Sequence, residues 1–371
     1  MKKHFYSVLA LVLVAQVVFA AAITKPDQIP GYYASVNGKS GSTLFDAIHT
    51  VAKKGYSSLS YSGLWGAYAT TDVYPGTMKI WDMYSNCNFT YGTNQCGNYK
   101  GECSCYNREH SIPKSWFGIK NESANNPSTD LFHIVPTDGF VNNQRSNWPF
   151  GEVSSASYTY DGSKLGSAKS ITVTNTMMGE GSVTKSCSVT VFEPQDQYKG
   201  DFARMYMGTM LRWAGDFQAF SSDKGKHMFT SQYTAASHWG LTEYGLALLI
   251  KWHRQDPVSE KEIDRNNAVQ AKQGNRNPFI DYPYLAEYIW GENAGKTVDM
   301  DDLMPSSDSE FIPGRSNGKR EKGSTEGIEE TVVEQHAAQK ILIGGQIYIL
   351  VGETIYTITG IPVSQINEIT K

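Results

Sequence analysis

Three side chains with different acid–base chemistry stand next to one another in the stretch NREHSIPKSWFG, at residues 107–118. Arg108 is a cation, Glu109 an acid and His110 a potential base. An unperturbed histidine has a pKa of about 6.5, so at neutral pH most of its imidazole can accept a proton from water. A carboxylate beside such a base can hold a divalent cation. The stretch therefore suggests hydrolysis assisted by a metal ion.

A second polar pattern follows in DLFHIVPTDGFVNNQRSNWPF, at residues 130–150. Pro136 suits the first turn of a helix, because the missing N–H would have no partner there. Asp138, Asn142 and Arg145 then recur at i, i+4 and i+7, which predicts that they share one helix face. Such a stripe on its own is usually a solvated surface. Beside the acid and base upstream, it could add further groups to the same site.

These residue types fit the cleavage of a phosphodiester with one metal ion. Mg²⁺ prefers hard oxygen ligands and keeps water and substrate phosphate as the remainder. Glu109 and the amide oxygen of Asn142 would supply two such ligands. His110 would take a proton from the attacking water. Arg145 could hold a phosphate oxygen through charge-assisted hydrogen bonds.

The two stretches resemble the bacterial endonuclease I family, which consists of secreted or periplasmic nucleases of the His-Me finger (ββα-metal) class. The resemblance continues in VFEPQDQYKGDFARMYM (191–207) and through residues 249–291, from LIKWHRQDP to YLAEYIWG. It covers residues 31–291 in the expected order. It implies an α+β fold, with a ββα-metal core embedded in a mostly helical domain.

The resemblance also implies a role for individual residues. It places metal binding on Glu109 and Asn142 and the general base on His110. Arg145 and Arg276 become candidates for phosphate contact. The implied activity is a largely sequence-nonspecific, Mg²⁺-dependent endonuclease that leaves 5′-phosphate and 3′-hydroxyl ends. Its substrate is nucleic acid, DNA with RNA as an open alternative, and Mn²⁺ and Ca²⁺ are open alternatives for the metal.

Asp130 and His133, in DLFHIVP, are expected to support the site from behind. For His133 the simpler interpretation is a hydrogen-bonded structural histidine. Adjacent residues on a regular strand point to opposite faces. We therefore expect Glu109 and His110 to lie at a strand end or a bulge, and Pro113 is consistent with a strand that ends there.

The N-terminus has the pattern of a secretory signal peptide at residues 1–22. Lys2 and Lys3 precede an apolar run at residues 6–18, and small residues end the segment at Ala20–Ala22. A membrane anchor is the alternative, but a span needs about 20 apolar residues and this run is shorter. We therefore predict an exported protein, periplasmic, extracellular or at the cell surface, without a stable membrane span.

Export implies an oxidising environment, in which clustered cysteines form disulfides. The chain has five cysteines: Cys87, Cys96, Cys103, Cys105 and Cys187. The first four are predicted to staple a loop just before the Arg-Glu-His stretch, but their pairing cannot be deduced. The alternative is a four-thiolate zinc site, although its usual Cys-x-x-Cys spacing is absent.

The pattern of apolar residues predicts helices at 44–52, 202–213, 241–254 and 260–273, the last with only a thin apolar stripe. Ser42 or Thr43 could cap the first helix. Alternating β-branched residues in 167–191 predict two strands. These elements would form the body that positions the site.

The composition changes after residue 291. We predict a catalytic domain at 23–291, an acidic flexible linker at 292–339 and a small β-rich tail at 340–371, built as a hairpin or a three-stranded unit. The tail is weakly similar to the C-terminal tails of exported Bacteroidetes proteins, or it is a dispensable appendage. Residues 292–371 have a net charge of −6, and the whole chain has −4. Without Lys2 and Lys3 of the signal peptide, residues 23–291 are therefore about neutral. Nucleic acid would thus be held by local geometry rather than by a general basic field.

Two other functions fit parts of the sequence. An extracellular binding or adhesion module with a non-catalytic nuclease-like fold would suit the stapled loop and the 22 tyrosines. Against it, Glu109, His110 and Asn142 are all present. A zinc hydrolase would need a ligand cluster such as His-Glu-x-x-His, which the sequence lacks.

Overall fold

The computed structural model describes residues 31–117, 127–179, 181–216 and 218–320, together with three strand segments at 339–343, 346–351 and 354–357. The chain forms two compact units, Met1–Glu321 and Lys322–Lys371. The predicted signal peptide at 1–22 lies outside the described residues. No helix in the described part of the chain has the length and apolar character needed to cross a membrane.

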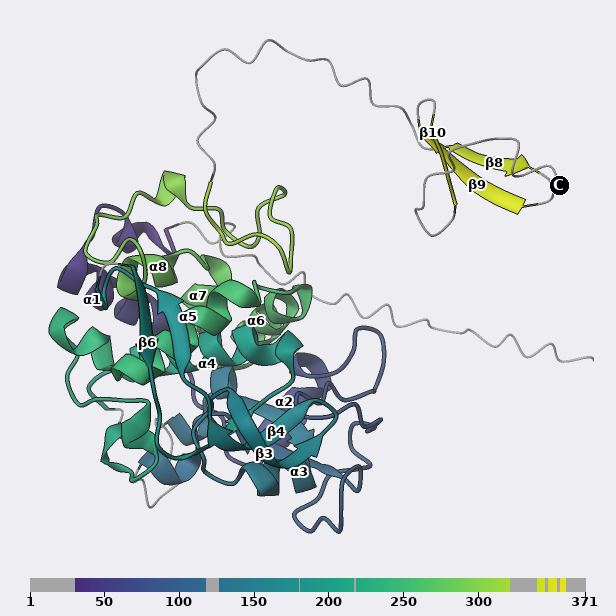
Figure 1. Cartoon of the computed structure of the whole chain (residues 1–371), viewed down its shortest axis with the longest axis horizontal. Helices are drawn as coiled ribbons and strands as arrows, with labels where there is room; N and C mark the ends of the chain where they lie inside the picture. The colour runs from purple at the N-terminus through teal and green to yellow at the C-terminus, as the bar shows by residue number, and fades with distance from the viewer. Residues whose placement is uncertain are drawn as a thin grey trace, which may run out of the picture. The chain divides into compact units, whose positions relative to one another are not determined.

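A buried helix forms the centre of the first unit. Every residue of α4 (Lys199–Arg212) is buried, and α1, α5 and α7 pack against it (Figure 1). The helices predicted at 202–213, 241–254 and 260–273 are all present. The first helix begins earlier than expected, because Ser40 rather than Ser42 or Thr43 is its N-cap. The α-helices are α1 (Gly41–Lys53), α2 (Gly63–Thr71), α3 (Gly139–Arg145), α4, α5 (Glu243–Gln255), α6 (Glu260–Gln273), α7 (Pro278–Asp281) and α8 (Leu285–Trp290).

The strands of this unit form three small antiparallel sheets, so that the fold is α+β as predicted. β1 pairs with β2, β4 lies between β3 and β7, and β5 pairs with β6. The β3–β4 hairpin turns at Asp161 and Gly162, which both have positive φ, as a type I′ turn requires. The strands are β1 (Tyr106–His110), β2 (Ile134–Asp138), β3 (Val153–Tyr160), β4 (Ser163–Ala168), β5 (Ile171–Thr174), β6 (Ser182–Lys185) and β7 (Thr190–Glu193).

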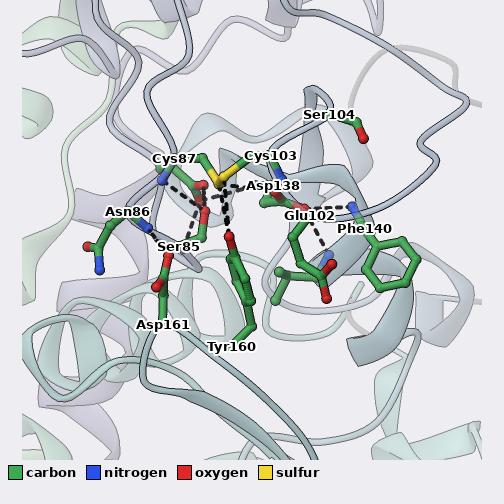
Figure 2. Close-up of a disulfide and its surroundings, with 12 residues drawn as sticks. Ser85, Asn86, Cys87, Glu102, Cys103, Ser104, Asp138, Phe140, Tyr160 and Asp161 are labelled. Carbon is green, nitrogen blue, oxygen red and sulfur yellow. Dashed lines mark hydrogen bonds between the residues drawn. A yellow bond between two sulfur atoms is a disulfide. The ribbon is translucent and has the colours of Figure 1, made fainter.

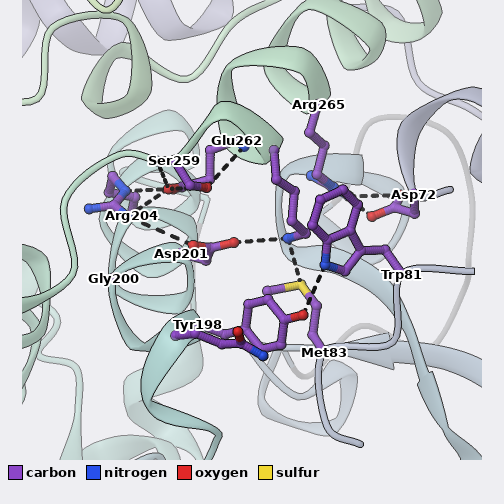
Figure 3. Close-up of polar contacts among 12 residues, drawn as sticks. Asp72, Trp81, Met83, Tyr198, Gly200, Asp201, Arg204, Ser259, Glu262 and Arg265 are labelled. Carbon is purple, nitrogen blue, oxygen red and sulfur yellow. Dashed lines mark hydrogen bonds and ion pairs between the residues drawn. The ribbon is translucent and has the colours of Figure 1, made fainter. Parts of the chain in front are cut away.

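Helix α6 is buried through ion pairs as well as apolar contacts (Figure 3). Glu262 accepts two hydrogen bonds from Arg204 of α4, at 2.5 and 2.7 Å. Lys261 donates to Asp201 of α4 at 2.8 Å. Buried charges are tolerated when they are paired in this way. The buried face of α6 therefore consists of its few apolar residues together with paired charged ones.

Residues 292–320 belong to the folded body, which differs from the predicted linker at 292–339. Val298, Leu303 and Phe311 are buried, and a 3-10 turn forms at Met300–Asp302. Leu303 also forms a β-bridge with Lys319. The prediction failed because single apolar residues can pack against the surface of a folded domain even when their spacing follows no helix or strand period.

The described part of the second unit is a small antiparallel sheet. β8 (Gln339–Ile343) pairs with β9 (Gln346–Val351), which pairs with β10 (Thr354–Thr357). Of the two forms expected for the C-terminal tail, a hairpin or a three-stranded unit, the described residues form the three-stranded one.

Candidate active site

The Glu-His pair occupies the last two positions of β1. Glu109 lies opposite Val135 and His110 opposite Ile134 in the antiparallel pairing with β2. Because β1 ends at His110, the neighbouring side chains can both reach the same edge of the sheet, as expected from the sequence. Helix α3 follows β2 directly, whereas short 3-10 turns lie between β1 and β2.

A cleft of about 380 Å³ opens at this strand end. It brings together Glu109, His110 and Asn142, which come from β1 and α3. The remaining lining residues are Arg108, Pro113, Lys114, Ser115, Ser146 and Asn147. The cleft is thus lined by an acid, a base and an amide, and the amide comes from a different segment of the chain.

Asn142 is positioned by the start of α3. The carboxylate of Asp138 caps this helix by accepting hydrogen bonds from the backbone N–H groups of Phe140 and Val141, at 2.8 and 3.0 Å. The side chain of Asn142 then donates from Nδ2 to Oδ1 of Asn107, at 2.7 Å. No described residue donates to Oδ1 of Asn142, which leaves this oxygen available at the cleft.

The helix start differs from the prediction. Pro136 lies inside β2, opposite Arg108, and the helix begins only at Gly139. Asp138 is therefore a cap and does not share a face with Asn142 and Arg145. A proline is tolerated in β2 because the sheet has only two strands, and an edge strand has N–H groups that need no strand partner.

The predicted cysteine staple supports the same cap. Cys87 pairs with Cys103 and Cys96 with Cys105, so all four clustered cysteines are in disulfides and none is a thiolate ligand for zinc. The backbone N–H of Cys103 donates to Oδ2 of Asp138 at 2.5 Å, and Sγ of Cys87 lies 3.4 Å from the same oxygen (Figure 2). The stapled loop is thereby joined to the N-terminus of α3.

Glu109 is buried, with one oxygen fixed and one left open. Its Oε1 accepts hydrogen bonds from the Tyr84 hydroxyl, at 2.9 Å, and from Nη1 of Arg145. No described residue donates to Oε2. Burial raises the pKa of Glu109 to about 6, although the charge of Arg145 and the two hydrogen bonds act in the opposite direction.

Arg145 has no free donor in this arrangement, which differs from its predicted contact with phosphate. A guanidinium has five N–H groups. Besides Glu109, they reach four oxygens: the carbonyls of Trp148 (3.2 Å), His110 (2.9 Å) and Ser111 (2.6 Å), and the Tyr206 hydroxyl (3.3 Å). Arg145 therefore holds Glu109 and the end of β1 in place.

Arg276 is also buried, and it does not line the cleft. Its Nε and Nη2 donate to the two carboxylate oxygens of Asp281, at 2.8 and 2.7 Å, and Nη1 donates to Gln270 at 2.7 Å. Tyr33 donates to the same carboxylate. The predicted phosphate contact has no support from this geometry, because Arg276 joins α6 to the last residue of α7.

His110 has a defined tautomer. Its Nε2 lies 3.1 Å from the carbonyl oxygen of Ser128, and since a carbonyl can only accept, Nε2 carries the proton. Nδ1 is left with its lone pair. Burial, and next the neighbouring His133, lower the pKa of His110 to about 3, so the imidazole is neutral at physiological pH. The ring lies nearly parallel to Tyr61, with centroids 5.9 Å apart.

Asp130 and His133 lie behind the cleft rather than in it. Asp130 is fully buried and accepts hydrogen bonds from Trp213 and Gln273, both at 2.9 Å. His133 donates from Nε2 to the carbonyl of Pro127 at 2.5 Å, and its ring packs edge-on against His110 at 5.8 Å. Both therefore buttress the segment that carries His110.

The structure adds contacts that sequence reasoning missed. Tyr84 and Tyr206 bind the Glu109–Arg145 pair, but nothing in their local sequence marks them. Arg108 lines the cleft, and a signal was available: it lies two residues before His110 on the same strand, so strand alternation places both on one face.

Comparison with known proteins identifies the family of this chain. A model of the Endonuclease I family matches residues 40–284. An extracellular ribonuclease of Bacillus amyloliquefaciens is 32% identical over 281 residues, which is 73% of this chain and 82% of that protein. An extracellular ribonuclease of Bacillus subtilis (strain 168) is 31% identical over 263 residues, covering 70% and 78% of the two chains. The family match spans β1, β2 and α3 and supports a nuclease, and this chain belongs to the Endonuclease I family.

Proposed function

We propose that this protein is a metal-dependent endonuclease that hydrolyses phosphodiester bonds with little regard to base sequence. The observation that carries the proposal is the shared cleft. Glu109, Asn142 and His110 line it, and each has one atom (Oε2, Oδ1 and Nδ1) that receives no hydrogen bond from any described residue. Two hard oxygens and one unprotonated ring nitrogen at one surface are the groups that this reaction needs.

The two open oxygens fit a divalent cation such as Mg²⁺. This ion takes few protein ligands and completes its coordination with water and phosphate oxygens. Glu109 and Asn142 would hold it with a single protein charge. When bound, the ion would supply charge neutralisation at the scissile phosphate and at the departing 3′ oxygen. Mn²⁺ and Ca²⁺ use the same oxygen chemistry and are tested beside Mg²⁺.

His110 acts as the general base. Nδ1 takes one proton from a water molecule, the water oxygen forms a bond to phosphorus, and the bond from phosphorus to the 3′ oxygen breaks. The departing 3′ oxygen takes a proton from a second water molecule. The products are a 5′-phosphate and a 3′-hydroxyl. The Ser128 carbonyl favours the imidazolium that forms, because it already accepts the hydrogen bond from Nε2. Arg145 fixes Glu109 and the carbonyl of His110 through this step.

The substrate class is nucleic acid of either sugar type. Water is the nucleophile, so no 2′-hydroxyl is required and DNA can be cut as well as RNA. Contacts to phosphate carry no base information, which accounts for sequence tolerance. The two Bacillus relatives named as extracellular ribonucleases support RNA as one substrate, and they also support export of this protein.

Cleavage of plasmid DNA and of a structured RNA tests the proposal. We expect both to be cut with Mg²⁺ and to survive in EDTA. His110→Ala should reduce the rate by about 10²–10⁴-fold, the usual effect of losing a general base. His227→Ala is a matched control, since His227 lies outside the cleft.

Metal binding is measured separately. Titration calorimetry with Mn²⁺ should show binding to the wild type that Glu109→Gln and Asn142→Ala weaken, whereas His110→Ala retains it. A His110→Ala protein that cuts within threefold of the wild type would contradict the mechanism. Intact substrate under all conditions would favour a binding module instead.

A further inference from the structure

A second arginine lies at the cleft, and its environment is unlike that of Arg145. Arg108 is half-buried, lines the cleft and lies two positions before His110 on β1. Residues two apart on a strand point to the same face and are about 6.6 Å apart along it. The guanidinium is therefore on the side of the strand from which His110 acts.

Aromatic rings hold the guanidinium of Arg108 in one place. Its central carbon is 3.8 Å from the ring centroid of Tyr61 and 4.6 Å from that of Trp65. Nη1 also donates to the carbonyl of Tyr61 at 2.6 Å. Stacking on aromatic faces restrains the cation while its N–H groups remain at the edge of its plane.

Most of the donors of Arg108 have no partner among the residues that the structure describes. Of the five N–H groups in a guanidinium, the bond to Tyr61 uses one, and the other four meet no acceptor among the described residues. No carboxylate forms an ion pair with Arg108 within the described parts of the chain. A fixed cation with unused donors at the edge of a cleft is suited to bind an oxyanion through two parallel hydrogen bonds.

We propose that Arg108 binds a phosphate group of the substrate backbone at the rim of the cleft. The inference rests on the proposed nuclease function and assigns to Arg108 the contact that the sequence suggested for Arg145. The ligand is a phosphodiester oxygen pair, which both DNA and RNA provide. Because the guanidinium recognises phosphate rather than a base edge, this contact adds affinity without adding sequence preference.

Equilibrium binding of a fluorescent single-stranded DNA oligonucleotide, in EDTA and over a series of salt concentrations, tests the contact. Arg108→Gln should raise Kd by at least tenfold. It should also reduce the slope of log K against log salt by about 0.7, the value for one phosphate contact on a single strand. Arg108→Lys keeps the charge, so the slope should persist while Kd rises only a few-fold.

Lys79→Gln is the matched control. Lys79 also lies over an aromatic ring, at 5.1 Å from the Tyr74 centroid, but it does not line the cleft. Its removal should leave both Kd and the salt slope unchanged. Thermal unfolding of each variant shows whether a change in binding reflects loss of the fold, and Arg108→Lys decides the matter if Arg108→Gln does not fold.

Cleavage assays with Mg²⁺ separate this inference from the function on which it rests. If the wild type cuts nucleic acid and a folded Arg108→Gln protein keeps the wild-type Kd and salt slope, the role of Arg108 is refuted and the nuclease function stands. If the wild type neither binds nor cuts, both are refuted. A raised KM for Arg108→Gln, with a smaller change in kcat, supports the phosphate contact.

Discussion

The floor and the rim of the cleft use arginine in opposite ways. We define the floor as Glu109 and the buried residues that contact it or its partner, Tyr84, Arg145 and Tyr206. The rim is Arg108 and Lys114, which line the cleft, with the aromatic residues Tyr61 and Trp65 that contact them. In the floor, the buried guanidinium of Arg145 donates all five of its N–H groups to protein oxygens. In the rim, the guanidinium of Arg108 is half-buried and donates one N–H group to an oxygen of the described residues. The number of donors left over, rather than the presence of an arginine near the catalytic residues, separates a residue that builds the site from one that can bind substrate.

Replacing Arg145 should produce the largest effect on stability. Arg145→Met leaves Glu109 buried without its cation, and breaking a buried ion pair from one side costs about 3–5 kcal/mol of unfolding free energy. Urea denaturation measures this loss. The matched substitution in the rim, Arg108→Met, should cost at most about 1 kcal/mol, since a partly exposed cation–π contact contributes about that much.

The double variant Arg145→Met/Glu109→Gln isolates the cause. It removes the unpaired charge and should recover part of the stability lost in Arg145→Met, although not activity. Equal losses for Arg145→Met and Arg108→Met would show that the two regions do not differ in the way described.

Removing one disulfide should lower the stability by a smaller amount and should affect the active site only through the N-terminus of α3. Cys87→Ser/Cys103→Ser releases a loop with a sequence separation of 16. Loops of this length correspond to about 3 kcal/mol of stability. Because this loop contacts the Asp138 cap, we also expect reduced nuclease activity while the other disulfide is retained. Cys187→Ser is the control, since Cys187 is a free cysteine. Unchanged stability and rate in the double variant would show that the loop does not position α3.

The support of α3 should also depend on pH through Asp82. This buried carboxylate accepts a hydrogen bond from the N–H of Asp138 at 3.1 Å, and burial raises its pKa to about 7. The folded state then binds this proton more strongly than the unfolded chain, where the pKa is ordinary. The resulting stabilisation is present below about pH 4 and is lost as the pH rises through 7.

Comparison of the wild type with Asp82→Asn isolates this titration. As the pH rises from 5 to 6, the unfolding free energy of the wild type should fall by about 1.4 kcal/mol relative to that of Asp82→Asn. Denaturation at a series of pH values measures it. A difference that does not vary with pH would mean that Asp82 is ionised in the folded protein.

Sequence reasoning located the elements that have a strong local pattern. The helices at 202–213 and 241–254 follow apolar spacing, which is a local property. The strand end at the Glu-His pair followed from the requirement that two adjacent side chains serve one site. These inferences need no knowledge of what packs against the segment.

The inferences that failed depend on which groups pack together in the folded chain. Arg145 meets Tyr206, and Arg276 meets Asp281, and no spacing rule tells a buried partner from a phosphate. Pro136 fits both a helix start and an edge strand, so only the pairing with β1 decides between them. Disulfide pairing likewise depends on the loop path, which composition does not determine.

The packing of residues 292–320 has a practical consequence for anyone who shortens this protein. A chain stopped at residue 291, where the family resemblance ends, would lose Val298, Leu303 and Phe311 and uncover the apolar surface beneath them. A stop codon or an inserted protease site just beyond Arg320 would instead detach the three-stranded C-terminal piece and keep that cover. The minimal folded protein therefore extends to about residue 320, beyond the family-model match that ends at residue 284.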